Sequence, residues 1–199
     1  GVQTCALPIL IMQKAMDSVK FDNSSVLKSI VPSQLSADAV SFSTENHLHT
    51  LLMCAAAHGS EKCADYLLLS GADPNKKNFT GFTALHWAAY AGRCEIVKKL
   101  LDKKANINCR NEEGQTPIHI ASMRGHLQFI KFLENEGADI HAVTSDGWNA
   151  IHYALIGNHK QVVKYLLEKG LDIWEQDING KTIDDIVKEY GRKWFYDLI

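Results

Sequence analysis

The chain has 199 residues, of which 46% are hydrophobic and 22% charged, and its formal net charge at pH 7 is -2. This length allows one or two domains, and the small negative charge gives no electrostatic reason to expect nucleic acid or an anionic membrane as the partner. No apolar run approaches the ~18 residues that a membrane helix needs. The apolar segment at residues 7–12 lacks the basic leading region and the cleavage site of a secretory signal. Because the five cysteines are odd in number and scattered, we expect buried thiols in a reducing compartment, the cytoplasm and also the nucleus.

The first 44 residues differ from the rest. Residues 1–9 look like the translation of a sequencing adapter, and no Met precedes Met12, so we expect an adapter-derived or assembly scar there. Residues 10–44 are interpreted as a degenerate N-terminal helical repeat or cap with a loop. Within them, Ile11–Lys20 and Ser24–Val31 predict two helices, the second ended by Pro32, and a loop rich in Ser, Ala and Asp follows.

From residue 45 onward the chain repeats itself with a step of 33 residues. Three sets of positions keep this step: Thr50, Thr83, Thr116, Asn149 and Thr182; Gly59, Gly92, Gly125, Asn158 and Gly191; Leu67, Leu100, Leu133, Leu166 and Ile199. A fixed period of this size marks stacked repeats that bury their apolar faces against their neighbours. The repeats are predicted at about 45–77, 78–110, 111–143, 144–176 and 177–199.

The repeat at 78–110 shows how each copy folds. Gly81 permits a tight turn, Thr83 can cap the first helix with its hydroxyl, and Gly92 ends that helix. The second helix then carries an apolar stripe of helical period. The stripe consists of Ile96, Val97, Leu100 and Leu101. The pattern therefore predicts an all-α array of helix-turn-helix repeats.

Three segments carry a family resemblance: GFTALHWAA from Gly81, GQTPIHIA from Gly114 and GWNAIHYA from Gly147. They resemble the ankyrin repeat, whose signature is Thr-Pro-Leu-His-x-Ala at a 33-residue period. The resemblance covers residues 45–199 and implies an all-α ankyrin-repeat solenoid of stacked helix-turn-helix units with β-turn or hairpin tips. It also implies that the signature histidines, His86, His119 and His152, hydrogen-bond across neighbouring turns without a catalytic role.

Several positions depart from the family pattern. Met53 and Asp185 replace the signature histidine, and we expect those two repeats to lose its hydrogen bond. Lys104 stands where other repeats have glycine, which asks a long side chain to accept a glycine-type backbone. Asn158 also replaces a glycine, and Glu134 interrupts an apolar pair. We expect the fold to absorb each departure at ~1 kcal/mol, because neighbouring interfaces supply most of the stability.

The resemblance implies a binding function. In ankyrin arrays the turn tips and the exposed side of the first helices form a concave surface that binds partner proteins. The tips carried over by position are Asn46, His47 and His49; Phe79, Thr80 and Phe82; Glu112, Glu113 and Gln115; Ser145, Asp146 and Trp148; Ile178, Asn179 and Lys181. The candidate partner-binding residues are Phe79, Phe82, Tyr90, Arg110, Glu112, Glu113, Met123, Arg124 and Trp148. Aromatic residues within a polar ring are typical of an interface hot spot; alternatively, Phe82 and Trp148 pack between adjacent tips.

We therefore expect a monomeric, non-enzymatic protein–protein interaction module without a cofactor, acting as scaffold, adaptor or targeting arm. The alternative is the substrate-recruiting ankyrin region of a larger enzyme or channel whose catalytic domain lies outside this chain. An intrinsic active site is disfavoured because the recurring histidines have no nucleophile at a fixed offset.

Two further alternatives concern metal and nucleic acid. A zinc site has the candidate ligands His47, His49, Cys54, His58 and Cys63, but their spacing fits no zinc finger. A nucleic-acid site has only the lysines of one second helix and its end. These are Lys98, Lys99, Lys103 and Lys104, and a lone lysine cluster in a net acidic chain is usually a solvated face.

Overall fold

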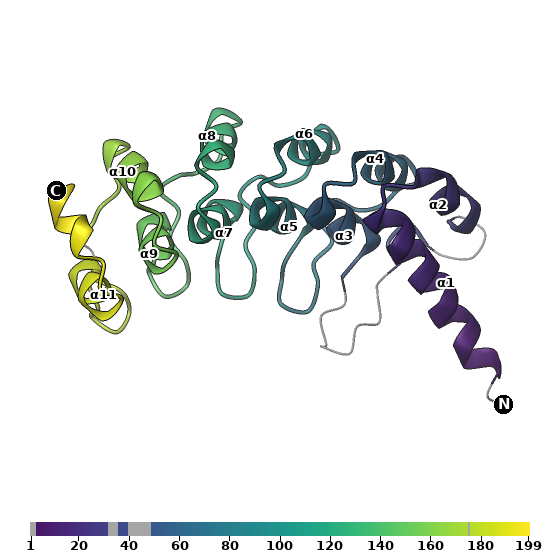
Figure 1. Cartoon of the computed structure of the whole chain (residues 1–199), viewed down its shortest axis with the longest axis horizontal. Coiled ribbons are helices and arrows are strands. Elements are labelled where there is room, and N and C mark those ends of the chain that lie inside the picture. Colours follow the sequence, from purple (N-terminus) through teal and green to yellow (C-terminus); the bar gives the residue numbers. More distant parts are fainter. Residues whose placement is uncertain (1–2, 32–35, 40–48, 175) are drawn as a thin grey trace. The chain divides into compact units, whose positions relative to one another are not determined.

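The computed structural model describes residues 3–31, 36–39, 49–174 and 176–199, with side chains from Leu10 onward. The chain divides into two compact units, Gly1–Cys109 and Arg110–Ile199, called here the N-terminal and C-terminal units. In both units the regular elements of the described residues are helices (Figure 1). The expected all-α fold is confirmed. In the described residues, no helix combines the length and the apolar character that crossing a membrane requires.

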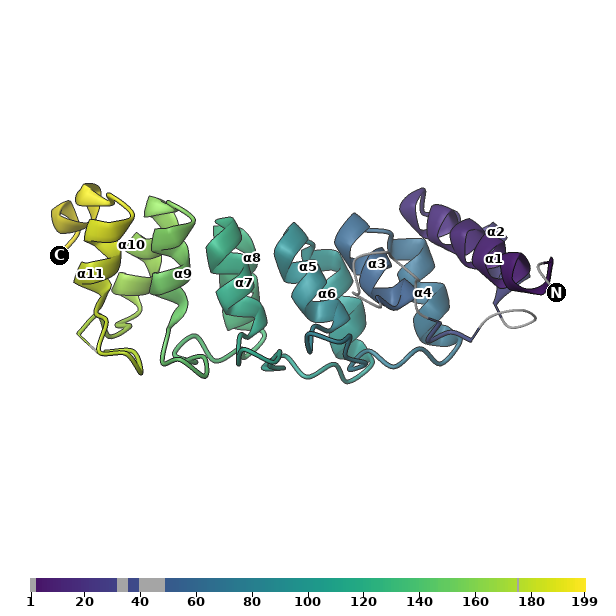
Figure 2. The same ribbon diagram turned by 90° about the horizontal axis from the view of Figure 1, so that it is seen from below.

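In its described residues, the N-terminal unit has three helix pairs. Their bounds are α1 Gln3–Lys20 and α2 Ser24–Ile30, α3 Leu51–His58 and α4 Glu61–Leu69, and α5 Ala84–Ala91 and α6 Cys94–Asp102. The first helices of the pairs pack in the order α1, α3, α5, and the second helices in the order α2, α4, α6. Two helix layers result, and the loops project from one side of them (Figure 2).

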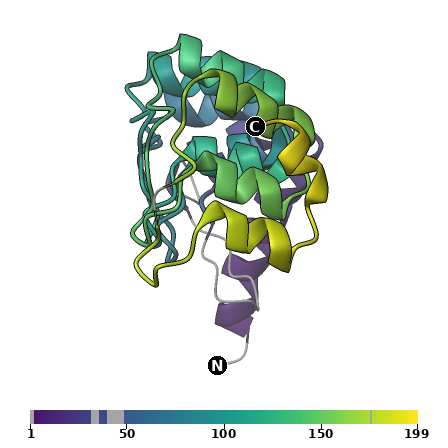
Figure 3. The same ribbon diagram turned by 90° about the vertical axis from the view of Figure 1, so that its left-hand side faces the viewer.

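The C-terminal unit repeats this plan. Its elements are α7 Pro117–Arg124 and α8 Leu127–Asn135, α9 Ala150–Ile156 and α10 Lys160–Glu168, and α11 Ile183–Glu189 with the 3-10 helix η1 Lys193–Asp197. Helix α9 packs against α7, α10 and α11. Figure 3 shows that within this unit, too, the loops leave the helices on one side. The tips that carry candidate binding residues are therefore separated from the packed helix layers.

The predicted 33-residue pattern accounts for the buried core. Leu67 and Leu100 are fully buried in the N-terminal unit, as are Leu133 and Leu166 in the C-terminal unit. The first helices α3 and α5 have eight residues each and are rich in alanine, so they pack closely against one another. Burial of this apolar surface, at about 25 cal/mol per Å², is the main stabilising term.

The N-terminal helix differs from its prediction. We expected a helix from Ile11 to Lys20, whereas α1 begins at Gln3, so the segment assigned to a scar continues the helix. Helix α2 ends at Ile30, one residue before the predicted end. Pro32 and most of the predicted loop lie outside the described residues. The nature of residues 1–9, and whether 10–44 form a full repeat, stay predictions.

Helix ends show how the two glycine replacements are tolerated. Gly92 ends α5 with φ 69°, a left-handed conformation that costs glycine nothing. Asn158 adopts φ 62° at the equivalent place, and asparagine is among the residues that best accept this region. Lys104 adopts φ 65°, as the sequence predicted, although lysine has no such preference. The backbone therefore keeps the repeat geometry even where the residue opposes it.

The described cysteines are free. Cys54, Cys63 and Cys109 are buried, and burial raises the pKa of the first two thiols to about 12 and that of Cys109 to about 11. Cys94 is partly exposed, and burial raises its pKa as well. These thiols stay protonated near neutral pH and behave as small apolar side chains.

Candidate functional site

Each of the four tips from residue 78 onward is held by one polar side chain at its first position. In the N-terminal unit, Asn78 Oδ1 accepts hydrogen bonds from Thr80 N at 3.1 Å and Phe82 N at 2.8 Å. In the C-terminal unit, Asn111 Oδ1 accepts from Glu113 N at 3.1 Å and Gln115 N at 2.8 Å. Such side-chain-to-backbone bonds fix a turn locally. Sequence reasoning missed this role, although the period already aligns Asn78, Asn111, Thr144 and Asp177.

The N-terminal unit presents its candidate residues to different degrees. Phe79 is 72% exposed directly after the turn-fixing Asn78, and Tyr90 is 39% exposed on α5. Phe82 is half-buried: its ring centroid lies 5.2 Å from that of His86 and 5.9 Å from that of Trp87. Phe79 and Tyr90 are thus accessible to a partner, whereas much of the Phe82 side chain is buried against residues of its own repeat.

Five candidate residues of the C-terminal unit lie on tips or at the end of α7. Arg110 donates to Gly114 O at 3.0 Å and to Val143 O at 2.5 Å, which joins two neighbouring loops. Glu112 and Glu113 are exposed on the tip, and Arg124 is exposed at the end of α7. Met123 is half-buried, and its carbonyl oxygen bonds His159 Nε2 at 3.0 Å. The two glutamates and Arg124 give this unit a charged rather than an aromatic surface.

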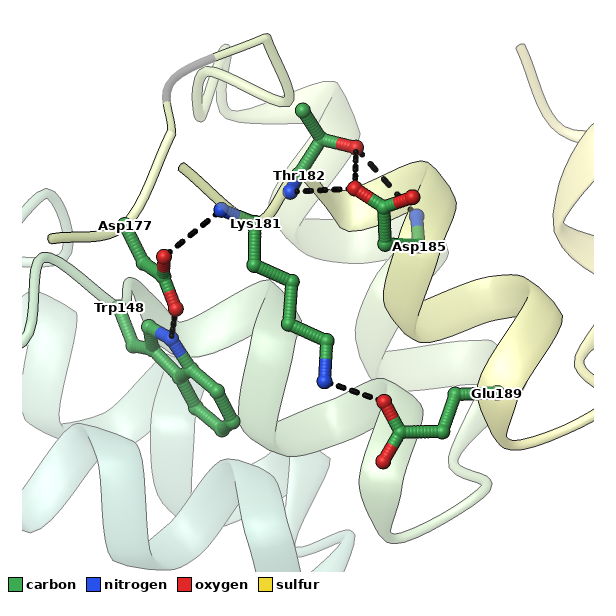
Figure 4. A network of polar contacts seen from close by, with 6 residues as sticks. All are labelled: Trp148, Asp177, Lys181, Thr182, Asp185 and Glu189. Atoms are coloured by element: carbon green, nitrogen blue, oxygen red, sulfur yellow. Dashed lines mark hydrogen bonds and ion pairs between the residues drawn. The ribbon is translucent and has the colours of Figure 1, made fainter. Parts of the chain in front are cut away.

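Trp148 is tied into the last tip (Figure 4). Its Nε1 donates to the buried Asp177 at 3.0 Å, and its ring stacks on His152 with centroids 5.5 Å apart. The indole hydrogen bond holds the pKa of Asp177 below its usual value. Lys181, on the same tip, forms an ion pair with Glu189 of α11. Trp148 therefore has the packing role that was the alternative interpretation, with part of its ring still exposed.

Gln115 corrects one tip assignment. It was placed on an exposed tip, but it is 7% exposed. Its Oε1 accepts from Asn111 Nδ2 at 2.9 Å, and its Nε2 donates to Tyr153 Oη at 3.1 Å. An amide with both ends satisfied inside the repeat is a structural group, so Gln115 is not part of a binding surface.

The signature histidines cap their helices. The Nδ1 atoms of His86, His119 and His152 accept hydrogen bonds from the N-cap backbone amides at 3.1, 3.0 and 3.2 Å. Nε2 then carries the proton, and His119 Nε2 donates across the turn to Ala142 O at 3.0 Å. Burial lowers the pKa of His119 and His152 to about 4. His119 and His152 are neutral structural groups. The bond across the turn that the family resemblance implied for all three histidines is present at His119 and wrong for His152, whose Nε2 is buried without a hydrogen-bond partner among the described residues.

The helix cap is kept at Met53 and Asp185, although both residues replace the signature histidine; the loss expected at these positions concerned the bond across neighbouring turns. Met53 Sδ lies 3.4 Å from Thr50 N, and Thr50 Oγ1 accepts from Met53 N at 3.2 Å. The Asp185 carboxylate accepts from Thr182 N at 2.9 Å and from its hydroxyl at 2.8 Å (Figure 4). A sulfur and a carboxylate replace the imidazole because the cap needs only an acceptor at the third helical position. Within the described residues, neither Met53 nor Asp185 forms a side-chain bond across the turn.

Two further polar assignments change. Glu134, expected to be a defect in the apolar stripe, bonds Lys169 Nζ at 2.6 Å and the Tyr165 hydroxyl on α10. These partners hold the pKa of its carboxyl below the usual value, against the opposing effect of burial. Lys98 and Lys99 are not simply solvated: Lys99 Nζ lies 2.8 Å from Asp65 Oδ2 on α4, and Lys98 Nζ lies 3.5 Å from a Glu95 oxygen.

The candidate zinc ligands have separate partners. Cys63 Sγ lies 3.5 Å from Ser18 O, and His58 Nδ1 lies 2.9 Å from Cys54 O. The His49 ring packs edge-on against Trp87 with centroids 4.6 Å apart. His47 lies outside the described residues. Among the residues that are described, no three His, Cys, Asp or Glu side chains converge on a point that could hold a metal ion.

One cysteine–histidine pair resembles a catalytic arrangement. Cys109 Sγ lies 3.5 Å from His86 Nδ1 and 3.3 Å from Thr83 Oγ1. His86 Nδ1 already accepts the Thr83 amide, and the raised pKa of Cys109 keeps its thiol protonated. A buried thiol without a thiolate is a poor nucleophile. This pair joins the segment after α6 to the start of α5.

Comparison with known proteins supports the repeat assignment. A family model described as ankyrin repeats (3 copies) matches residues 15–111 and 85–177. The chain is 41% identical over 85 residues to "Inactive serine/threonine-protein kinase TEX14" of Bos taurus, covering 42% of this chain and 5% of that protein. It is 36% identical over 62 residues to human "Serine/threonine-protein kinase TNNI3K", covering 31% and 7%. It is 44% identical over 55 residues to "Protein fem-1 homolog A-like" of Mus musculus, covering 28% and 8%.

These alignments span less than a tenth of each of the three relatives. They place the similarity in the repeats and not in a kinase domain. The helix pairs, the capped first helices and the family matches across residues 15–177 agree. The chain belongs to the ankyrin repeat family.

Proposed function

We propose that this chain captures partner proteins through its tips and the exposed side of its first helices, as a scaffold, adaptor or targeting arm. Ankyrin repeats are a protein-interaction module, and the observation that carries the proposal is Phe79. Its side chain is 72% exposed on a turn fixed by the side chain of Asn78. A large apolar side chain on a pre-organised turn loses little conformational entropy on binding, which is the property of an anchor residue.

The proposed surface has different chemistry in the two units. Phe79, Tyr90 and part of Phe82 supply apolar area in the N-terminal unit. The C-terminal unit contributes charged and half-buried residues: Arg110, Glu112, Glu113, Met123, Arg124 and Trp148. We propose a monomeric module in the cytoplasm and nucleus, where the described free thiols would remain reduced.

Comparative affinity capture tests this function. The wild-type chain, a Phe79→Ala/Tyr90→Ala variant and a Phe21→Ala variant are each immobilised, and bound proteins are quantified by mass spectrometry. Phe21 is a matched control because it is 74% exposed but lies at the end of α1, away from the tips. We expect the proteins that bind the wild-type chain to bind Phe21→Ala as well and to be lost from the double variant.

Circular dichroism melting accompanies the capture. We expect nearly the same melting temperature for all three chains, because all three changed side chains are exposed. Loss of capture together with collapse of the fold would show that Phe79 and Tyr90 belong to the core. Equal capture by the wild type and the double variant would refute the proposed surface.

The second candidate is a substrate-recruiting region of a larger enzyme or channel. Two of the relatives are named as serine/threonine-protein kinases, one of them inactive, and this chain spans only 5% and 7% of them. Sequencing the complete transcript tests this candidate. A coding frame that continues into a catalytic or channel domain would support it, and a frame that ends within the repeats would remove it.

A further inference from the structure

Two loops of the N-terminal unit are held side by side by one asparagine. Asn75 lies on the loop after α4, and its Nδ2 donates to Lys104 O at 3.0 Å on the loop after α6. Its Oδ1 accepts from Asn106 N at 2.8 Å. This double bridge brings together two pairs of lysines, one on each loop. We call them the loop lysines: Lys76, Lys77, Lys103 and Lys104.

The loop lysines differ from the lysines of α6 itself. Lys98 and Lys99 form ion pairs with Glu95 and with Asp65. All four loop lysines are exposed, and none of them forms an ion pair with a described residue. Within the described part of this unit, no carboxylate pairs with these four ammonium groups, so their charge is available to an anionic ligand.

The carboxylates around the loop lysines reduce their charge without cancelling it. Asp73 Oδ1 accepts a hydrogen bond from Asn75 N at 2.8 Å, and Asp38 Oδ1 accepts from Asp73 N at 2.9 Å. Asp102 is exposed at the end of α6. Four ammonium groups thus face a smaller number of carboxylates, two of which are engaged in fixing the loops.

Lys104 is kept in a conformation that lysine does not favour. Its φ is 65°, in the place where other repeats have Gly71, Gly137 and Gly170. A Cβ added at any of those three glycines would meet nothing within 4 Å. The position therefore opens to solvent, and packing does not account for a side chain there. A strained backbone that no packing contact of the side chain offsets is typical of functional positions.

Phe79 supplies an apolar group close in sequence to one of the two lysine pairs. It follows Lys77 by two residues and is 72% exposed on a fixed turn. A ligand of the loop lysines and Phe79 needs negative charge for the lysines and an apolar group for the ring. A peptide with Asp or Glu around a Leu, Ile or Phe provides both within a few residues.

We propose that the loop lysines and Phe79 bind an acidic segment of a partner protein, with an apolar side chain on Phe79 and flanking carboxylates paired to the lysines. This inference rests on the proposed function and names its partner chemistry. A nucleic acid is the less suitable polyanion because Asp73 and Asp102 would meet its continuous phosphate backbone. A peptide can place its carboxylates only where ammonium groups lie.

A peptide array tests the partner chemistry directly. It displays peptides of about 12 residues, a length that spans such a surface, in which Leu or Phe is flanked by Asp/Glu, by Lys/Arg or by Ser/Gly. The probes are the full wild-type chain, Lys76→Glu/Lys77→Glu, Lys103→Glu/Lys104→Glu, Phe79→Ala and Lys104→Gly. The control, Lys14→Glu/Lys62→Glu, makes the same charge change at exposed lysines on α1 and α4. An oligothymidylate is titrated alongside by fluorescence anisotropy.

We expect the acidic peptides with an apolar residue to bind the wild type, more weakly as salt is raised. Each loop-lysine reversal should weaken binding by about tenfold, since it replaces attraction by repulsion, and Phe79→Ala should weaken it similarly. The control should bind as the wild type does. Lys104→Gly should bind less tightly without a lower melting temperature, which separates a binding role from a folding role.

The contrary outcomes are distinguishable. Binding of peptides of any composition with no dependence on the loop lysines would overturn this inference and leave the proposed function standing. Absence of peptide binding would also overturn it, while affinity capture tests the proposed function separately. Preference for the oligothymidylate, lost in the lysine reversals, would replace the acidic protein segment by a nucleic acid.

Discussion

The N-terminal and C-terminal units follow the same helix-pair plan but use their polar side chains differently. In the C-terminal unit, polar side chains of the tips have partners within the unit: Trp148 bonds to Asp177, and Lys181 pairs with Glu189. In the N-terminal unit the residue equivalent to Trp148 is Phe82, which has no polar atom to satisfy. There, the loop lysines and Phe79 remain accessible. A repeat scaffold can thus be stable whether its polar side chains bond to one another or remain exposed to solvent.

The largest expected loss of stability comes from the buried leucines, which both units share. Leu100→Ala in the N-terminal unit and Leu166→Ala in the C-terminal unit each remove a side chain that is 0% exposed. Each should cost about 2–5 kcal/mol of unfolding free energy, the range for a leucine-sized cavity. Denaturant unfolding followed by circular dichroism measures this. Lys98→Ala is the exposed control. An unchanged midpoint in either leucine variant would contradict the stacking register of its unit.

Acid should act through the histidines of the C-terminal unit. The folded-state pKa values of His119 and His152 are about 4, below the unfolded value of about 6.5. The unfolded chain therefore binds more protons in this window, so stability is full above about pH 6.5 and falls as the pH drops towards 4. At pH 5 the loss is about 2 kcal/mol for each imidazole.

Denaturant unfolding at a series of pH values from neutral to about 5 measures this loss, because ordinary carboxylates remain ionised over that range. His141→Gln, which changes an exposed imidazole of the same unit, is the matched control. A flat wild-type profile would show that His119 and His152 take up protons as readily in the folded chain as in the unfolded chain.

The turn-fixing side chains allow a matched test between units. Asn78→Ala removes the acceptor for Thr80 N and Phe82 N and should cost about 1–3 kcal/mol, the penalty for unsatisfied polar groups. Asp177→Ala should cost more, since it also removes the acceptor for Trp148 Nε1. Thermal melts followed by circular dichroism give the order. A smaller effect of Asp177→Ala would mean that the indole bond contributes nothing.

The smallest effect concerns the glycine-type position. Lys104→Gly should stabilise the N-terminal unit by up to about 1 kcal/mol, because it relieves a left-handed backbone in a residue with a Cβ. Gly137→Lys, the reverse change in the C-terminal unit, should destabilise it by a similar amount because Gly137 has φ 90°. Paired melting curves measure both. Two shifts of the same sign would contradict the account of strain at these positions.

The period and the local signals predicted the architecture well. Thr50 and Thr182 cap their helices, and the buried leucines lie where the 33-residue step placed them, because caps and apolar stripes depend on residues close in sequence. The missed features depend on partners in other repeats. Glu134 is read as a defect until Tyr165, 31 residues away, is placed beside it. Gln115 looks like a surface residue until Tyr153 covers it.

The candidate surface was less predictable for the same reason. Exposure of Phe79 follows from its place in a turn, whereas the half-burial of Phe82 and Trp148 depends on how aromatic rings pack on His86, Trp87 and His152. The grouping of the loop lysines depends on the bridge made by Asn75. The sequence had grouped Lys103 and Lys104 with Lys98 and Lys99, because residues near in sequence are easier to associate than residues on two loops.

The turn-fixing side chain has a consequence for how such chains diverge. It controls the tip conformation from the first turn position, so the second position is released from any folding requirement. The residues found there are Phe79, Glu112, Ser145 and Ile178, which span aromatic, acidic, hydroxyl and aliphatic chemistry. Mutations at this one position per tip can therefore change ligand preference with little penalty in thermodynamic stability, and selection can alter partners without first restoring the fold.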